Sequence, residues 1–350
     1  MRRLDIARVA TSTPMGAEAY QAQIIGAARP ALARTSTDAW RVDELVFRSL
    51  RSRLEGNRRL PLGRVAVAPA GVRRTLGRAL FRGDVVTHRM SLELPPGAID
   101  VVTLHDTVAW EFSDESAPVP AAAAELRRAA AVICVSEFSA GRAVELLGID
   151  PPHVIHNGVD AHYFDAVPLD SSTLAGLGMT SPYVLHAGGA AVRKNLAALA
   201  EAWPLVHRER PDLTLALVGP PHPRRTELFE GMPGVRLLGR VDGALMPGLV
   251  AGAATVVVPS LYEGFGLPAL EGMAAGAPVV AANTSSLPEV VGETGILTEP
   301  TGVALAAGML DATSGDPSIA ATVTAARTRA RAFTWERSAD AHAQVWASVS

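Results

Sequence analysis

The chain has 350 residues, and at about 150 residues per domain this length predicts two domains, each with its own core. With 48% apolar and 19% charged residues, its composition is that of a globular protein and excludes disorder or collagen-like repeats. The one cysteine excludes an internal disulfide. No apolar run approaches the roughly 18 residues that span a bilayer, and no signal-peptide core is evident, so a cytoplasmic location is expected.

Charge is unevenly distributed along the chain, although the net charge is only −3. Residues 41–90 contain 12 arginines against Asp43, Glu44, Glu55 and Asp84, a local charge of +8, which leaves −11 for the rest. This asymmetry predicts either an ordinary solvated face or a peripheral contact with a polyanion or an anionic membrane surface. Lys194 is the single lysine among 32 basic residues, which suggests that a compact ammonium is needed there.

The first half of the chain predicts a mixed α/β domain. Apolar runs predict strands at 98–106, 130–136 and 153–157, with a helix at 139–148. Before residue 89 the pattern is ambiguous, because the segments 4–12, 41–50 and 63–70 could each be strands.

The second half shows regular alternation of short, β-branched apolar runs and helical stretches, which is typical of parallel βαβ units. The strands are predicted at 183–188, 213–219, 235–239, 254–260, 278–283 and 295–300, and the helices at 194–209, 223–230, 243–252, 267–275 and 286–292. We therefore expect an N-terminal domain over 1–165, a linker over 166–181, a doubly wound domain over 182–333, and a final helix over 334–350 that packs back toward the first domain.

Two such domains would place the carboxyl ends of their strands around a central cleft, where open parallel sheets bind ligands. The segment HAGGAAVRKN puts Gly188 in a turn after one strand and Arg193 and Lys194 at the mouth of the next helix. Free N–H groups and two cations suit a diphosphate there. The alternative is a surface turn that simply opens a helix.

The segment SLYEGFGLPALEGMAAG predicts a second group at a strand end. Glu263 follows the strand, and Glu271 shares a helical stripe with Leu267, expected as a core residue, and Ala274. A carboxylate on such a stripe needs a partner, for which a pair of hydroxyls is well suited. The alternative is that Glu271 complements the helix dipole and Glu263 is an ordinary loop carboxylate.

In the first domain, His88, His105 and Asp106 follow apolar runs and are candidates for the acceptor side of the cleft. A histidine at a strand end can orient a hydroxyl or carry a proton near neutral pH. The alternative is a structural hydrogen-bonding role.

Several motifs are missing from the sequence. It contains no D-x-D, no phosphate-binding P-loop and no Cys/His cluster with zinc spacing, so neither a metal nor a cofactor is expected. The stretch GFGLPA (264–269) imitates a dinucleotide fingerprint, but it lies three residues beyond the strand and no acidic residue ends a strand about 20 positions later. A dehydrogenase is therefore disfavoured.

The run from Tyr183 to Pro300 resembles the donor domain of retaining family-4 glycosyltransferases of the GT-B fold, which have two Rossmann-like domains facing a central cleft. The resemblance rests on the E-x7-E segment EGFGLPALE and on the RKN segment. TLHDT, VICVSEFSAGRAVELLG and VIHNGVD extend it into the first domain, where only Gly16 corresponds to the usual Gly-rich diphosphate loop. Within the family, the chain is most similar to mannosyl- and rhamnosyl-type polysaccharide transferases.

The resemblance implies a role for each matching residue. Arg193 and Lys194 would neutralise the donor diphosphate, Glu263 would contact the donor sugar, Glu271 would hold the ribose hydroxyls, and His105 would lie near the sugar. The remaining donor-side candidates would be Gly16, Gly188, Gly264, Phe265, Gly266 and, at the start of the predicted helix 267–275, Leu267.

The expected activity is metal-independent, retaining transfer of a hexose, mannose from GDP-mannose, to a saccharide or lipid-linked saccharide, with peripheral contact to an anionic membrane and no nucleic-acid partner. Three alternatives stay open: a UDP- or dTDP-sugar donor, a sugar-nucleotide epimerase of similar fold, and a non-catalytic sugar-nucleotide-binding subunit.

Overall fold

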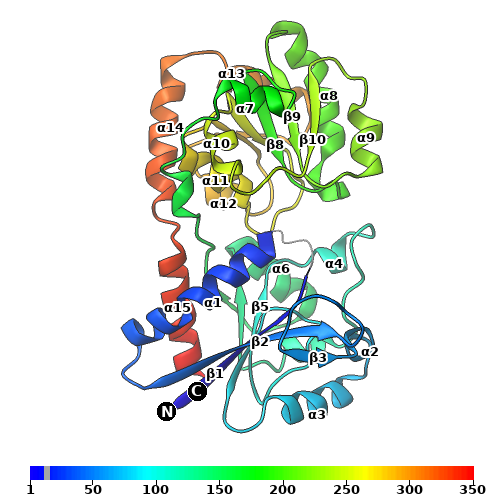
Figure 1. Ribbon diagram of the computed structural model, residues 1–350, viewed down its shortest axis with the longest axis vertical. Coiled ribbons are helices and arrows are strands. Elements are labelled where there is room, and N and C mark those ends of the chain that lie inside the picture. Colours follow the sequence, from blue (N-terminus) through cyan, green and yellow to red (C-terminus); the bar gives the residue numbers. More distant parts are fainter. Residues whose placement is uncertain (12–15) are drawn as a thin grey trace. The chain divides into compact units, whose positions relative to one another are not determined.

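The computed structural model describes residues 1–11 and 16–350, which form two compact units (Figure 1). Unit 1 contains residues 1–158 and 334–350, and unit 2 contains residues 159–333. The chain leaves unit 1 at Gly158, seven residues before the predicted end of the first domain at residue 165. Residues 166–181, predicted as a linker, belong to unit 2, because α7 (Ser171–Gly176) forms there and the Leu169 side chain packs against Gly248.

Unit 1 is built on a seven-stranded sheet in which every pairing is parallel, in the order β3-β2-β1-β4-β5-β6-β7. Side chains alternate between the two faces of each strand, so Val101 and Ile133 join one core cluster, whereas Val102 and Val132 join another. The strands are β1 (Arg2–Val9), β2 (Trp40–Ser49), β3 (Arg58–Leu60), β4 (Val86–Arg89), β5 (Ile99–Leu104), β6 (Ala131–Cys134) and β7 (His153–Val154).

Helices cover both faces of this sheet. On one face α1 (Gly16–Thr35) packs beside α15 (Trp335–Ser348), the helix expected at the end of the chain (Figure 1). On the other face α6 (Glu137–Leu147) packs on β5 and β6. The other helices of unit 1 are α2 (Leu62–Ala66), α3 (Ala70–Leu80), α4 (Val108–Glu111) and α5 (Ala122–Leu126).

Of the three ambiguous segments before residue 89, two are strands, β1 and β2. The third, 63–70, is not a strand: it contains most of α2, a turn and the first residue of α3. A strand would bury Val65 and Val67 on the same face, but Val67 is exposed, and Leu62 and Val65 are buried at helical spacing instead. β3, β4 and α1 were not predicted.

Unit 2 is built on a six-stranded parallel sheet in the order β10-β9-β8-β11-β12-β13. Numbered from β8, this is the 3-2-1-4-5-6 order of a doubly wound Rossmann sheet. All six predicted strands are present, with ends that differ by at most two residues. They are β8 (Tyr183–Ala187), β9 (Thr214–Val218), β10 (Val235–Gly239), β11 (Thr255–Val258), β12 (Val279–Ala282) and β13 (Ile296–Thr298).

Two glycines allow helices to approach this sheet closely from opposite sides. Gly272 of α11 (Leu267–Ala275) lies against Val279 and Val256, and Gly308 of α13 (Gly302–Ala312) lies against Val280. Because neighbouring residues of a strand point to opposite faces, Val279 and Val280 place the two helices on opposite sides. The other helices are α8 (Leu196–Glu209), α9 (Pro223–Phe229), α10 (Met246–Ala251), α12 (Leu287–Val291) and α14 (Pro317–Ala330).

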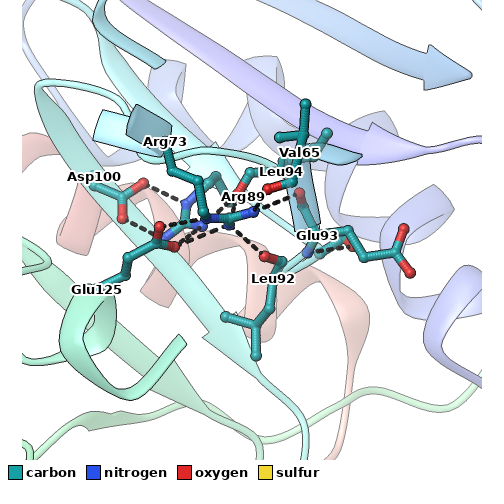
Figure 2. A network of polar contacts seen from close by, with 9 residues as sticks. Val65, Arg73, Arg89, Leu92, Glu93, Leu94, Asp100 and Glu125 are labelled. Atoms are coloured by element: carbon teal, nitrogen blue, oxygen red, sulfur yellow. Dashed lines mark hydrogen bonds and ion pairs between the residues drawn. The ribbon is translucent and has the colours of Figure 1, made fainter. Parts of the chain in front are cut away.

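A network of buried charges holds unit 1 together (Figure 2). Arg73 Nε donates to Glu125 Oε1 over 2.6 Å, and Arg89 Nη1 donates to Glu125 Oε2 over 3.0 Å. Arg89 also forms a bidentate pair with Asp100, at 2.8 and 2.7 Å. The remaining donors of Arg73 bind main-chain carbonyls of four residues, Val65, Leu92, Glu93 and Leu94.

This network changes the interpretation of the basic segment 41–90. Two of its 12 arginines, Arg73 and Arg89, are fully buried and neutralised by Asp100 and Glu125. Nine of the others are exposed, at positions 41, 51, 53, 58, 59, 64, 74, 78 and 82.

Among the residues that the structure describes, no helix has both the length and the apolar character needed to cross a membrane.

Candidate active site

The candidate site in unit 2 lies where the order of the sheet reverses. β8 and β11 are neighbouring parallel strands, and the chain leaves them in opposite directions along the sheet, toward β9 and toward β12. Such a switch point, at the carboxyl ends of the strands, is where open α/β sheets bind ligands. The loop after β8 carries Arg193 and Lys194 in a 3₁₀ turn (Val192–Lys194), and the loop after β11 carries Glu263.

Lys194 and Glu263 meet across these two loops. Lys194 Nζ donates to both oxygens of Glu263, at 2.7 Å to Oε1 and 2.8 Å to Oε2, and Ser260 Oγ donates to Oε1 over 2.7 Å. Glu263 is only 6% exposed. Since an ammonium carries three N–H donors, two on Glu263 leave the third for a ligand oxygen. The structure thus brings together two residues that lie 69 positions apart and that the sequence singled out.

Glu263 is ionised at neutral pH. Burial alone would raise the pKa of its carboxyl group, but the charges of Lys194 and Arg193 and the hydrogen bonds from Lys194 and Ser260 hold that pKa below its usual value. Arg193 reaches the same carboxylate, with Nη1 3.8 Å from Glu263 Oε2, and also donates to the carbonyl of Tyr262 over 3.4 Å. Two cations therefore share one carboxylate at this point.

Polar residues that sequence reasoning missed fix these loops. Asn195, in the left-handed conformation with φ of 53°, donates through Nδ2 to the carbonyls of Pro259 and Pro300 over 3.0 and 2.9 Å. Asparagine tolerates this backbone region and supplies two side-chain donors. Ser285 Oγ accepts from the Glu263 N–H over 3.0 Å, and Ser286 Oγ donates to the Glu263 carbonyl over 2.9 Å. The RKN spacing was the only signal for Asn195, and the serines gave none.

Glu271 is held separately, on α11. Its carboxyl group is half-buried and hydrogen-bonded to the hydroxyl of Tyr163, which belongs to the short 3₁₀ turn Ala161–Tyr163. Burial is the main cause that raises its pKa to about 7, and the nearby Asp160 adds to the rise, whereas the bond from Tyr163 opposes it. Tyr163, also missed from sequence, is thus the hydroxyl partner of Glu271 in this structure.

The glycine-rich loop between the two glutamates is buried. Phe265 is 3% exposed and packs edge-to-face on Phe333, with ring centroids 5.9 Å apart. Gly266 has φ of 103°, and a Cβ there would stand 2.8 Å from the Leu287 side chain, so α11 needs a glycine at its start. Gly264 is buried beside them. Ala274 is buried as expected, but Leu267 is only half-buried. Leu270 and Met273 lie in the core beside Ala274 instead.

At the end of β8, His186 is 2% exposed and lies beneath Gly188. Its Nδ1 lies 3.1 Å from the carbonyl of Val257, so Nδ1 carries the proton and donates. Burial lowers its pKa to about 4, so the ring is neutral at neutral pH. Gly188 itself is half-buried in the turn that follows.

The candidates in unit 1 occupy different settings. His88 lies inside β4 rather than after a strand, and it is fully buried: its Nε2 is 2.8 Å from Thr103 Oγ1, and its Nδ1 accepts from Trp346 Nε1 over 3.3 Å. This places His88 in the core of unit 1 instead of on an acceptor surface. Burial lowers its pKa well below the usual value.

His105 and Asp106 directly follow β5 and are half-buried. The His105 ring packs edge-to-face on Tyr20 at 4.7 Å, and burial lowers its pKa to about 4. Asp106 Oδ1 accepts from the N–H of Val108 over 3.2 Å. Gly16 is exposed at the first position of α1, and residues 12–15 of its loop lie outside the described residues.

Comparison with solved structures defines the class of fold. A crystal structure of HepE from Anabaena, in complex with UDP and glucose, superposes with a TM-score of 0.76 over 99% of this chain and 100% of that chain, at 21% identity. WaaG, a glycosyltransferase involved in lipopolysaccharide biosynthesis, gives a TM-score of 0.71 over 98% and 99% of the two chains, at 17% identity. Two Rossmann-like parallel-sheet domains in one chain are the GT-B fold.

Sequence comparison identifies the family. The model described as "Glycosyltransferase Family 4" matches residues 50–163, and the model described as "Glycosyl transferases group 1" matches residues 181–314. The O-antigen chain mannosyltransferase B of Escherichia coli is 32% identical over 59% of this chain and 57% of its own length. A D-inositol 3-phosphate glycosyltransferase of Streptomyces scabiei is 30% identical over 68% of this chain and 59% of its own length. The chain belongs to the family-4 glycosyltransferases, and it spans less than two thirds of these two relatives.

Proposed function

We propose that this chain is a retaining hexosyltransferase that moves mannose from GDP-mannose to a saccharide or lipid-linked saccharide without a metal ion. The observation that carries the proposal is the arrangement of Lys194, Arg193 and Glu263 at the switch point of unit 2, where two cations share one buried carboxylate. Cations at the carboxyl ends of these strands suit a diphosphate, and the mannosyltransferase relative from E. coli supports mannose as the sugar.

The leaving group is a nucleoside diphosphate, on which negative charge builds as the glycosidic bond breaks. Lys194 and Arg193 stabilise that charge, and fixed cations in a partly buried site do so without reorganisation. Glu263 keeps Lys194 in place and contacts the donor sugar, while Glu271 accepts from the ribose hydroxyls, the bond that Tyr163 makes in this structure. The acceptor hydroxyl attacks the anomeric carbon from the face that the diphosphate leaves, so the configuration of that carbon is retained.

The first experiment is thermal stabilisation against GDP, UDP, dTDP, ADP and NAD without added metal, because a ligand that binds only the folded state stabilises it by about 2.7 kcal/mol at a hundred times its Kd. A shift with GDP supports the proposal. A shift with NAD alone contradicts it. Turnover of GDP-mannose in EDTA, with the product's anomeric configuration read by NMR, then tests metal independence and retention.

A UDP-hexose is the second candidate donor. It is favoured by the solved HepE structures, which contain UDP and UDP-glucose. A shift with UDP but not GDP would select it. An epimerase would convert the sugar nucleotide in the absence of an acceptor, and a non-catalytic subunit would bind it without turnover, so product analysis with and without acceptor separates these alternatives.

We place the acceptor on unit 1. Arg41 pairs with Asp43, but the exposed Arg51, Arg53 and Arg64 have no ion-pair partner among the described residues and suit an anionic glycan or the phosphate of a lipid-linked acceptor. Sedimentation with phosphatidylglycerol vesicles, against phosphatidylcholine vesicles as control, tests contact with an anionic membrane.

A further inference from the structure

Arg225, on α9, holds together the turns that follow β8 and β9. Its Nη2 donates to the carbonyls of Gly188 and of Gly189, the latter over 3.1 Å, and its Nη1 donates to the carbonyl of Pro220 over 2.8 Å. The residue is 3% exposed. One guanidinium thus fixes three carbonyls on two neighbouring turns at the carboxyl edge of the sheet.

Gly219 makes this contact possible. Its φ of +146° is one that residues with a side chain rarely adopt. A Cβ at this position would stand 2.0 Å from the carbonyl oxygen of Gly188 and 2.8 and 2.9 Å from the two Nη atoms of Arg225. Any side chain here would therefore separate the turn after β8 from the guanidinium.

The charge of Arg225 is not neutralised locally. Among the described residues no carboxylate lies within ion-pair distance of it, and all its hydrogen-bond acceptors are neutral carbonyls. Burying a cation without an ion-pair partner is costly. Arg225, Lys194 and Glu263 all act electrostatically on the His186 ring, so all three lie near it.

The direction of the carbonyls determines the direction of the amides. In a trans peptide the N–H points opposite to the C=O of the same unit. Because the carbonyls of Gly188 and Gly189 point at Arg225, the N–H groups of Gly189 and Ala190 point away from it. Within the described part of the chain, neither N–H has a hydrogen-bond partner. Two successive free amides five and four residues before Lys194 are suited to bind an anion.

We propose that Arg225 is a positioning residue of the donor site: it shapes the turn Gly188–Ala190 so that the amides of Gly189 and Ala190, with Lys194, bind the β-phosphate of the donor. This inference rests on the proposed function. Arg225 does not touch the donor; it acts through the turn, and its charge favours an anion there.

The test is calorimetric binding of GDP and GMP, which differ by the β-phosphate, to the full chain and to Arg225→Met. In wild type GDP should bind more tightly than GMP. In Arg225→Met the ratio of the two Kd values should fall at least fivefold, with GMP affinity within twofold of wild type. An overall loss of structure would weaken both ligands alike. Arg208→Gln, which removes a charge from an exposed position on α8, should leave the ratio unchanged.

Gly219→Ala provides a second variant that keeps every charge and should lower the ratio in the same way. Gly243→Ala, where a Cβ meets nothing within 4 Å, is its control. Arg225 uses two nitrogens to reach carbonyls on two turns, whereas a lysine side chain ends in one nitrogen, so Arg225→Lys should keep the wild-type ratio only in part. An unchanged ratio in Arg225→Met or Gly219→Ala, or an equal loss of GDP and GMP, overturns the role of Arg225 while leaving the proposed function intact. If the wild-type chain binds none of GDP, UDP, dTDP or ADP, the proposed function itself fails, and the inference with it.

Discussion

The two units share the same strand order around their switch points but treat buried charge in opposite ways. In unit 1, two arginines and two carboxylates, Arg73, Arg89, Asp100 and Glu125, form a closed network with no net charge (Figure 2). In unit 2, three cations, Arg193, Lys194 and Arg225, lie near a single carboxylate, Glu263.

The difference separates structural from functional charge. A neutral network in which the donors are satisfied by carboxylates and main-chain carbonyls leaves nothing for a ligand, whereas Arg225, at the ends of β8 and β9, has no carboxylate within ion-pair distance among the described residues, and its charge favours an anion there. Both arrangements include buried charged side chains, such as Arg73 in unit 1 and Arg225 in unit 2, so burial alone does not distinguish them; the balance of charge does.

The largest expected effect comes from opening the closed network. Glu125→Ala should lower the free energy of unfolding by about 3–5 kcal/mol, because it leaves Arg73 and Arg89 buried and partly unpaired. Chemical denaturation followed by circular dichroism measures it. Glu93→Ala removes the same charge from an exposed side chain nearby and should have little effect. Equal stability of the two variants would mean that the network is not structural.

In unit 2, Lys194→Ala should reduce kcat for sugar transfer by about 10²–10³-fold, since a fixed donor to the charge of the transition state is lost. Glu263→Gln, which keeps the shape but not the charge, should also abolish most turnover while the fold persists. Steady-state kinetics, with near-UV circular dichroism to confirm folding, provide the measurement. Normal turnover in Glu263→Gln would remove that residue from the catalytic site.

The pKa of Glu271 predicts a pH dependence. An ionised carboxylate accepts from the ribose hydroxyls, so nucleotide affinity should fall as pH drops through about 7. Between pH 8 and pH 6, Kd should rise by up to about tenfold. Titration calorimetry across this range tests it, with Glu271→Gln as the control for ionisation of the nucleotide phosphate. A parallel dependence in wild type and Glu271→Gln would contradict the assignment.

The raised pKa of Glu271 affects folding stability with the opposite pH dependence: it stabilises the folded state at low pH, whereas nucleotide binding is favoured at high pH. The folded pKa of Glu271, about 7, lies above its unfolded value of 4.5, so the folded state holds a proton that the unfolded state has lost. This contribution is complete below pH 4.5 and disappears as pH rises through 7. Unfolding midpoints of wild type and Glu271→Gln should therefore diverge as the pH is raised from about 4.5 to 7, and their difference should stay constant above pH 7.

The smallest expected effect is that of Tyr163→Phe. The hydrogen bond from Tyr163 lowers the pKa of Glu271, so its removal should move the midpoint of the binding profile to higher pH. Well above pH 7 the variant should bind nucleotide at least as tightly as wild type, because the ribose no longer competes with the phenol hydroxyl. The same calorimetric series measures both effects, and a midpoint shifted to lower pH would contradict them.

Sequence patterns predicted unit 2 far better than the start of unit 1. The six strands of unit 2 are short and almost wholly apolar, because both faces of a parallel sheet are buried, and such runs are recognisable without context. β2 mixes exposed and buried residues irregularly, and β3, at the sheet edge, buries only Leu60. Their strand character depends on the pairing of β2 with β1 and of β3 with β2, which no local pattern records.

The residues of the candidate site likewise fall into those that the sequence predicted and those that it did not. Lys194 and Glu263 stand out because each follows a strand within a motif, and parallel strands bring their carboxyl ends together. Arg225, Tyr163 and Ser285 reach the site through contacts between segments far apart in the chain, and nothing in their local sequence distinguishes them. His88, by contrast, resembled a residue after a strand, although β4 continues through it into the core of unit 1.

The sequence alone determined that the chain forms two α/β domains, that a lysine and a glutamate follow strands of the second, and that these residue types suit a nucleotide sugar. Periodicity and motif spacing are local properties, so the sequence carries them directly. Only the tertiary structure decided which charges are neutralised and which are left in excess, because that balance depends on atoms brought within about 4 Å of each other by folding.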